Sequence, residues 1–290
     1  MNYLVELLVS GLAVGAVYGL IAMSFAIIFK ATGLLNFAQG EMGMVTAYVA
    51  FSIASSTDGN PWLTAAGAIV FSVLFALAVE RIVIRPMVDE PILARIMTTI
   101  GLAVILRSGT MLVWDALPHD MGLAAGSALV DLGGVRVRGA QIGVVVALAV
   151  SVAAMLAFFR YSRFGIAMRA VASDDATARL MGVKTARVQQ AAWGAAAVMS
   201  GIAGALFAIA WELSPSLYAL GLKSFPATIL GGLDSVVGSA FGGLVIGVTE
   251  NLVGGYLSPG LKEVAGFVII IAILMVRPYG LFGEKRIERL

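Results

Sequence analysis

Three polar side chains, Asn36, Gln39 and Glu41, stand in an otherwise apolar part of the sequence, among the glycines of the segment GLLNFAQGEMG. Because lipid offers no hydrogen-bond partners, such groups are expected to face protein or a water-filled cavity. A helix broken at glycines exposes backbone N–H and C=O groups that can hold a polar solute, as in the midplane sites of many transporters. The predicted chemistry is reversible binding along a translocation path. The alternative is a tight helix crossing joined by Asn and Gln hydrogen bonds, and both can hold at once.

A second polar spot, IGVTENLVGG, places Glu250 and Asn251 well inside another apolar run. Carboxylates within a membrane are rare and count as functional candidates by default. The alternative is that the apolar region ends earlier, which would put Glu250 at the outer membrane interface. Arg107 lies about two turns from Trp114, so it is expected to snorkel to the interface rather than to pair with Glu41 or Glu250. The residues predicted to line a translocation path are Asn36, Gln39, Gly40, Glu41, Glu250 and Asn251.

Membrane-spanning helices are the elements that must position these residues. The chain has 290 residues, of which 60% are hydrophobic and 12% charged, whereas a soluble domain is about 45–50% apolar and about 25% charged. The predicted fold is an all-α polytopic transmembrane helix bundle of about seven to nine spans, some broken or re-entrant. It forms a single domain, 1–290. The clear spans are predicted at 4–29, 34–56, 62–84, 94–114, 139–159, 190–212 and 261–277.

Glycine patterns predict two further features of the bundle. Residues 214–257 are Gly-rich and apolar, and are expected either to cross twice as a broken hairpin or to re-enter. Within them GLDSVVGSAFG resembles LLNFAQGEMG, with Asp234 and Gly238 in the places of Asn36 and Gly40. Such a match is typical of internally repeated transporters, and the alternative is that chance supplies it in a chain with 34 glycines. A close helix-packing seam is predicted in the first span at Gly11, Gly15 and Gly19.

Lys and Arg are concentrated in alternate connectors. They gather in the loop 160–189 and in the C-terminal tail, while 57–61 and the segment before the first span have none. Because an excess of Lys and Arg marks the cytoplasmic side, the N-terminus is predicted outside and the C-terminus inside.

The loop 160–189 is too long for a simple turn and is predicted to hold two short helices. Phe164–Val171 is compatible with a helix, and SDDATARLMG indicates a second one with Ser173 or Asp174 as its N-cap. Gly182 is expected to close that helix. Two capped helices favour a docking surface for another protein. The alternative is a solvated basic loop that only obeys the positive-inside rule.

The sequence carries no signature of catalysis or nucleotide binding. It has no GxxxxGK motif followed by Ser or Thr, no Gly-x-Ser-x-Gly motif and no cysteine. His119 is the single histidine, so no metal site is expected. The net charge of +2 is too small to imply nucleic acid as a partner. The chain is therefore predicted to be no enzyme and to need no cofactor, and uphill transport would take its energy from a partner or from ion binding.

The chain resembles the LivH-type permease subunit of branched-chain amino acid ABC importers, nearly from end to end. The matching stretches are GLLNFAQGEMGM, ERIVIRPM, RYSRFGIAMRAVASDDATARLMGV, SFPATILGGLDSVVGSAFGGLVIGVTENL and VRPYGLFG. The resemblance implies a multi-pass permease in the lipid bilayer of the cell inner membrane. It also implies three kinds of partner: a second permease of the LivM type, two cytoplasmic ATPase subunits of the LivG and LivF type, and an extracytoplasmic substrate-binding protein.

The resemblance also implies roles for two groups of residues. The polar motif of the family falls on Asn36 to Glu41, where many relatives carry His in place of Gln39, so proton coupling at this spot is not favoured. The ATPase-coupling motif falls on Gly165, Arg169, Ala170, Asp174, Asp175 and Gly182. The implied cargo is leucine, isoleucine or valine, carried by alternating access that the ATPases drive. Urea, short amides and other amino acids stay open as cargo, and the rival class is an ion-coupled carrier or channel.

Overall fold

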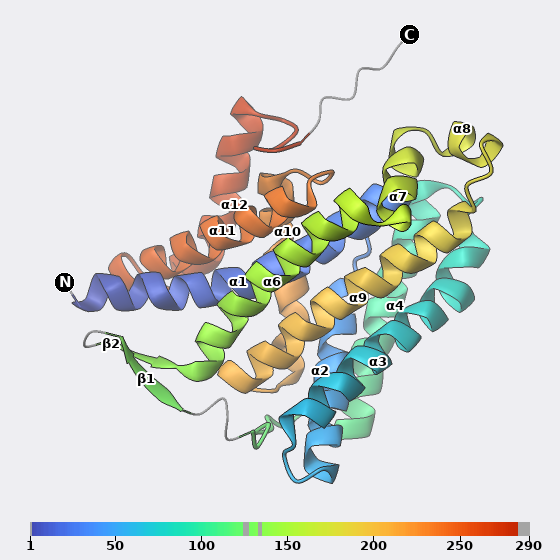
Figure 1. Cartoon of the computed structure of the whole chain (residues 1–290). Coiled ribbons are helices and arrows are strands. Elements are labelled where there is room, and N and C mark those ends of the chain that lie inside the picture. Colours follow the sequence, from blue (N-terminus) through green and yellow to red (C-terminus); the bar gives the residue numbers. More distant parts are fainter. Residues whose placement is uncertain (1, 124–127, 133–134, 284–290) are drawn as a thin grey trace.

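The computed structural model describes residues 2–123, 128–132 and 135–283, and these are mostly helical. The helices are α1 (Asn2–Thr32), α2 (Gln39–Ser56), α3 (Pro61–Val79), α4 (Ile92–Trp114), α6 (Gly139–Tyr161), α7 (Arg163–Ser173), α8 (Asp175–Leu180), α9 (Thr185–Ala210), α10 (Ala219–Gly231), α11 (Val236–Tyr256) and α12 (Pro259–Val276). A hairpin of β1 (Leu129–Leu132) and β2 (Val135–Arg138) is antiparallel. It lies at one end of the bundle, and α7 and α8 lie at the other (Figure 1).

Seven of the described helices are long and apolar enough to cross a membrane: α1, α3 with its extension, α4, α6, α9, α11 and α12. The extension of α3 consists of a π-helical turn, η1 (Glu80–Ile84), and a 3-10 turn, η2 (Arg85–Met87). The predicted all-α transmembrane bundle is thus confirmed. The basic residues of the tail at 284–290 lie outside the described ranges.

α1 is the most deeply buried of these spans and packs along α11 (Figure 1). An ideal Cβ on Gly247 would lie 2.2 Å from the Cα of Gly15, and one on Gly243 would lie 2.3 Å from the Cα of Gly19. No side chain fits between backbones at that separation. The predicted glycine seam is therefore confirmed, and α11 is its partner.

The predicted span 34–56 is wrong at its start, because α2 begins only at Gln39 and the residues before it are not helical. Gly33 has a φ of +65°, a conformation that ends helices and suits glycine. The Oδ1 of Asn36 then accepts a hydrogen bond from the N–H of Ala38 at 3.1 Å, a local turn that competes with helix. The polar stretch is consequently a break before α2 rather than a part of it.

The segment after α9 also contains a break. α9 ends at Ala210, and Leu213 forms two backbone hydrogen bonds with His119, beyond the end of α4, at 2.8 and 3.3 Å. The 3-10 turn η3 (Pro215–Tyr218) follows and leads into α10. α10 has 13 residues, about 20 Å of helix, which is too short for a hydrocarbon layer of about 30 Å.

α10 ends at the opposite end of the bundle from Leu213. There the Nζ of Lys30, near the end of α1, donates to the carbonyl oxygen of Asp234 at 3.0 Å. α11 then returns along α10, with Gly238 packed against Gly231. Residues 214–257 therefore form a hairpin in which a broken arm precedes a continuous helix, and of its two helices α11 alone is long and apolar enough to cross a membrane.

Two parts of the chain share one plan, in which a long helix is followed by an irregular segment and a shorter helix. They are α1 with α2, and α9 with α10. The two shorter helices meet at their first turns, where a Cβ on Gly40 would lie 2.9 Å from the Cα of Gly221. The predicted echo of Gly40 at Gly238 is wrong, because Gly238 lies in the first turn of α11 and packs on Gly231. The structural counterpart of Gly40 is Gly221.

Candidate functional site

The amide pair at the start of α2 is buried and hydrogen-bonded. The Nδ2 of Asn36 donates to the Oε1 of Gln39 at 2.9 Å. The Nε2 of Gln39 donates to the carbonyl oxygen of Ala196 at 3.2 Å and to the Oγ of Ser200 at 3.0 Å, both on α9. Both amide side chains are fully buried. In this structure they join the break before α2 to the middle of α9, which is the arrangement of a tight helix crossing.

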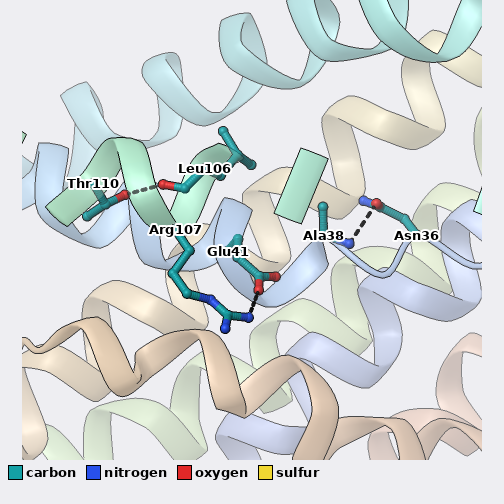
Figure 2. Close-up of polar contacts among 6 residues, drawn as sticks. All are labelled: Asn36, Ala38, Glu41, Leu106, Arg107 and Thr110. Atoms are coloured by element: carbon teal, nitrogen blue, oxygen red, sulfur yellow. Dashed lines mark hydrogen bonds and ion pairs between the residues drawn. The ribbon is translucent and has the colours of Figure 1, made fainter. Parts of the chain in front are cut away.

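Glu41, two residues after Gln39, forms an ion pair across the helices. The Nη2 of Arg107 on α4 lies 2.9 Å from the Oε1 of Glu41 (Figure 2). The Cζ of Arg107 also stacks 3.4 Å from the ring centroid of Tyr218, in the turn before α10. The side chain of Glu41 is 5% exposed and that of Arg107 is 35% exposed. α2, α4 and the start of α10 therefore meet at one charged contact.

The expectation that Arg107 snorkels away from Glu41 is wrong. A carboxylate buried without a counter-charge is far more costly than one that is paired, and this cost outweighs the gain from taking Arg107 to the interface. Trp114 is held instead by a hydrogen bond from its Nε1 to the Oγ of Ser52 at 2.7 Å. α4 is thereby fixed beside α2, with Arg107 at the level of Glu41.

Glu250 and Asn251 lie in a different contact, between α1 and α11. The hydroxyl of Tyr18 donates to the Oε2 of Glu250 at 3.0 Å. The Nδ2 of Asn251 donates to the carbonyl oxygen of Gly247 in its own helix at 2.9 Å. Because α11 continues to Tyr256, Glu250 lies within a continuous helix rather than at its end. Both residues are buried, and in the described part of the chain neither forms a hydrogen bond or ion pair with Asn36, Gln39 or Glu41. The predicted path residues thus form two groups.

A further buried carboxylate is absent from the sequence prediction. Glu80, in the π-helical turn after α3, lies 3.3 Å from the Nη2 of Arg85 and accepts a hydrogen bond from the Nε2 of Gln190 at 3.1 Å. Its only sequence signal is its place at the end of an apolar run, which is equally typical of a residue at the interface. Tyr18, Ser200 and Tyr218 are missed for a similar reason, since hydroxyls and aromatic rings are common in apolar helices.

The loop 160–189 contains the two helices predicted for it. The Oγ of Ser162 accepts from the N–H groups of Phe164 and Gly165, which caps α7. Asp174 caps α8 by accepting from the N–H of Thr177 at 3.1 Å, so Asp174 rather than Ser173 is the N-cap. Gly182 follows α8 with a φ of +84°, as the closing residue that was predicted.

An apolar tip results at the end of α8. Leu180 and Met181 are 87% and 81% exposed. Arg169 is exposed on α7, while Gly165 packs closely on α6, where a Cβ would clash with the carbonyl oxygen of Phe158. The side chain of Asp175 lies outside the described part of the structure. Within that part no group of three or more His, Asp or Glu residues is placed to hold a metal ion.

Comparisons with known proteins point in one direction. The family model described as "Branched-chain amino acid transport system / permease component" matches residues 7–276. The high-affinity branched-chain amino acid permease LivH of Escherichia coli is 32% identical, over 99% of this chain and 98% of its own. The corresponding protein BraD of Pseudomonas aeruginosa is 28% identical over the same shares. The solved structure of PsaBC from Streptococcus pneumoniae in complex with Fab is similar in fold, with a TM-score of 0.50, 15% identity and coverage of 92% of this chain and 94% of that one.

Proposed function

The chain belongs to the family of branched-chain amino acid transport permeases, and we propose that it forms half of the translocation pathway of an ABC importer for leucine, isoleucine and valine. The family is one of transport permeases, and we propose that ATP hydrolysis is carried out by partner subunits and not by this chain. The observation that carries the cargo assignment is the match of curated branched-chain amino acid permeases over almost the whole chain.

The partners follow from the need for energy and for selectivity. A second permease of the LivM type supplies the other half of the pathway. Two ATPase subunits of the LivG and LivF type bind on the cytoplasmic side, and an extracytoplasmic binding protein delivers the amino acid. The chain lies in the inner membrane with its N-terminus outside and its C-terminus inside, as the positive-inside rule predicts.

The α7–α8 loop is proposed as the ATPase-docking element. Leu180 and Met181 expose two large apolar side chains to solvent on a short capped helix, and such residues are typical of an interface. The helix α8 lies at one end of the bundle, between α7 and α9 along the chain (Figure 1). The residues proposed for coupling remain Gly165, Arg169, Ala170, Asp174, Asp175 and Gly182.

The passage is proposed to run beside the junction of α2, α4 and α10. Asn36, Gln39 and Gly40 form the framework of its wall, and Glu41 contributes charge. Glu250 and Asn251 support the α1–α11 side of the same bundle. Closure of the ATPases on ATP moves the α7–α8 loop, and the helices attached to it expose the passage to one side of the membrane and then to the other.

An ion-coupled carrier receives less support from the same contacts. It would need intramembrane carboxylates that can bind a cation, and Glu41 and Glu250 are the obvious candidates. Glu41 is paired with Arg107, and Glu250 accepts a hydrogen bond from Tyr18. Because both carboxylates already have protein partners, a structural role is favoured over ion binding for each of them.

Reconstitution tests the proposal. The chain is purified with its second permease and ATPases, placed in liposomes with its binding protein, and assayed for uptake of leucine, isoleucine, valine, urea and short amides. We expect ATP-dependent uptake of the three branched amino acids that does not depend on an ion gradient. Uptake of urea or amides alone would change the cargo, and concentrative uptake driven by an ion gradient without ATPases would overturn the proposal.

A further inference from the structure

Arg107 is a charge placed deep in a membrane-spanning helix. Between Met97 and Trp114 it is the single charged residue of the sequence. It lies 15 residues from the start of α4 and 7 from its end, which corresponds to about 22 Å and about 10 Å along the helix axis. Intramembrane charges of this kind are costly and are typically kept for function.

The guanidinium of Arg107 is held on two sides, and its Nε is buried without a hydrogen-bond partner. Glu41 binds its Nη2 and the ring of Tyr218 lies against its plane, while about a third of the side chain, 35%, remains exposed. A guanidinium has five N–H donors and binds carboxylates in a two-pronged manner. In the described structure Arg107 makes a single hydrogen bond, the one to Glu41. It therefore retains donors for a second carboxylate.

The exposed surface next to Arg107 is aliphatic. Val104 and Met111 lie three residues before and four residues after it, on the same side of α4, and both are exposed. Leu222, one turn beyond Tyr218, is exposed on α10. A cation surrounded by exposed aliphatic side chains suits a ligand with a carboxylate at one end and a branched hydrocarbon at the other.

We propose that Arg107 contacts the cargo, and that its guanidinium receives the carboxylate of the amino acid in the passage while Glu41 and Tyr218 position it. The proposal rests on the proposed function. Because Glu41 already neutralises part of the positive charge of Arg107, the carboxylate of the cargo is bound weakly and can be released. A conduit needs such weak binding, because it must release what it admits.

The test must separate this role from simple neutralisation of Glu41. R107Q, E41Q and the double variant R107Q/E41Q are assembled with the second permease, the ATPases and the binding protein, and leucine uptake in liposomes is measured together with ATP hydrolysis. R107Q is expected to lower uptake at least tenfold. The double variant removes both charges, so no buried carboxylate is left unpaired, yet we expect its uptake to stay as low because the receiving cation is missing.

The pair of Arg85 and Glu80 is a matched control. Its arginine side chain is also 35% exposed and its carboxylate is also buried, at a separation of 3.3 Å. The double variant R85Q/E80Q is expected to restore most of the uptake lost in R85Q, because only charge balance is at stake there.

Three results would overturn the proposal for Arg107. Recovery of uptake in R107Q/E41Q to near the wild-type rate would make Arg107 only the counter-ion of Glu41. Loss of the second permease from purified R107Q complexes would make this face a subunit contact. ATP hydrolysis that falls in parallel with uptake would indicate a coupling defect. Failure of the wild-type complex to take up any amino acid would instead refute the proposed function.

Discussion

Replacement of Gly247 by alanine tests whether the backbone contact between α1 and α11 holds the bundle together. The added Cβ would lie 2.2 Å from the Cα of Gly15, 2.3 Å from its nitrogen and 2.8 Å from the carbonyl oxygen of Gly11. Ordinary contacts between carbon atoms are about 3.5–4.0 Å. The two helices must therefore separate by roughly 1.5 Å, because the opposing atoms are backbone and no flexible side chain can move away.

The energetic cost follows from that separation. Overpacking of a buried site costs about 1–3 kcal/mol. Alanine gains about 0.5–1 kcal/mol over glycine in helix propensity, which offsets part of the cost. We expect a net loss of about 1–2 kcal/mol, which lowers the melting temperature by about 2–8 °C at about 2–4 °C per kcal/mol.

The assay is thermal unfolding of the purified protein in detergent, followed by the loss of the monodisperse peak in size-exclusion chromatography. G143A on α6 is the matched control, because an ideal Cβ at Gly143 has no atom within 4 Å. It should melt at or slightly above the wild-type temperature. If G247A melts no lower than wild type, the seam is not a determinant of stability and the reasoning fails.

Three further predictions address the other contacts. Tyr18→Phe removes the hydroxyl that donates to Glu250 and should destabilise the protein by about 1–3 kcal/mol in the same melting assay, whereas an unchanged melting temperature would show that this hydrogen bond contributes nothing. Gln39→Leu removes the bonds that join α2 to α9 and should cost a similar amount, about 1–3 kcal/mol, while equal melting temperatures would contradict a structural role for the amide. Leu180→Asp and Gly182→Val should leave membrane insertion intact but reduce co-purification of the ATPases or uptake per ATP hydrolysed, and normal values of both would remove α8 from the proposed docking surface.

Features that depend on local chemistry are predictable from the sequence. The caps of α8 follow from Asp174 and Gly182, because a capping side chain and a left-handed glycine act within a few residues. The seam in α1 follows from glycines spaced four apart, since that spacing places them on one helix face. The identity of α11 as the partner does not follow, because many helices of this chain carry small residues.

Features that depend on which helices meet are not predictable in this way. Nothing in the apolar sequence around Arg107 shows that α4 packs beside the start of α2, so the ion pair with Glu41 is visible only in the folded chain. The counterpart of Gly40 is missed for the same reason. Gly221 stands in ALGL without an adjacent polar residue, whereas Gly238 resembles Gly40 in sequence but packs at the other end of α10.

One continuous set of contacts joins the α7–α8 loop to the charged contact at Arg107. α8 leads into α9, and α9 holds Gln39 through Ala196 and Ser200. Gln39 lies in the first turn of α2, two residues before Glu41, which carries the ion pair. A displacement of α9 by the ATPases would therefore reach the first turn of α2 directly. Spatial continuity alone does not demonstrate coupling, so the decisive comparison is a double-mutant cycle of Gln39→Leu with Leu180→Asp. If the two residues act independently, their effects on uptake per ATP hydrolysed multiply. If they act through a shared route, the effect of the double variant is smaller than that product.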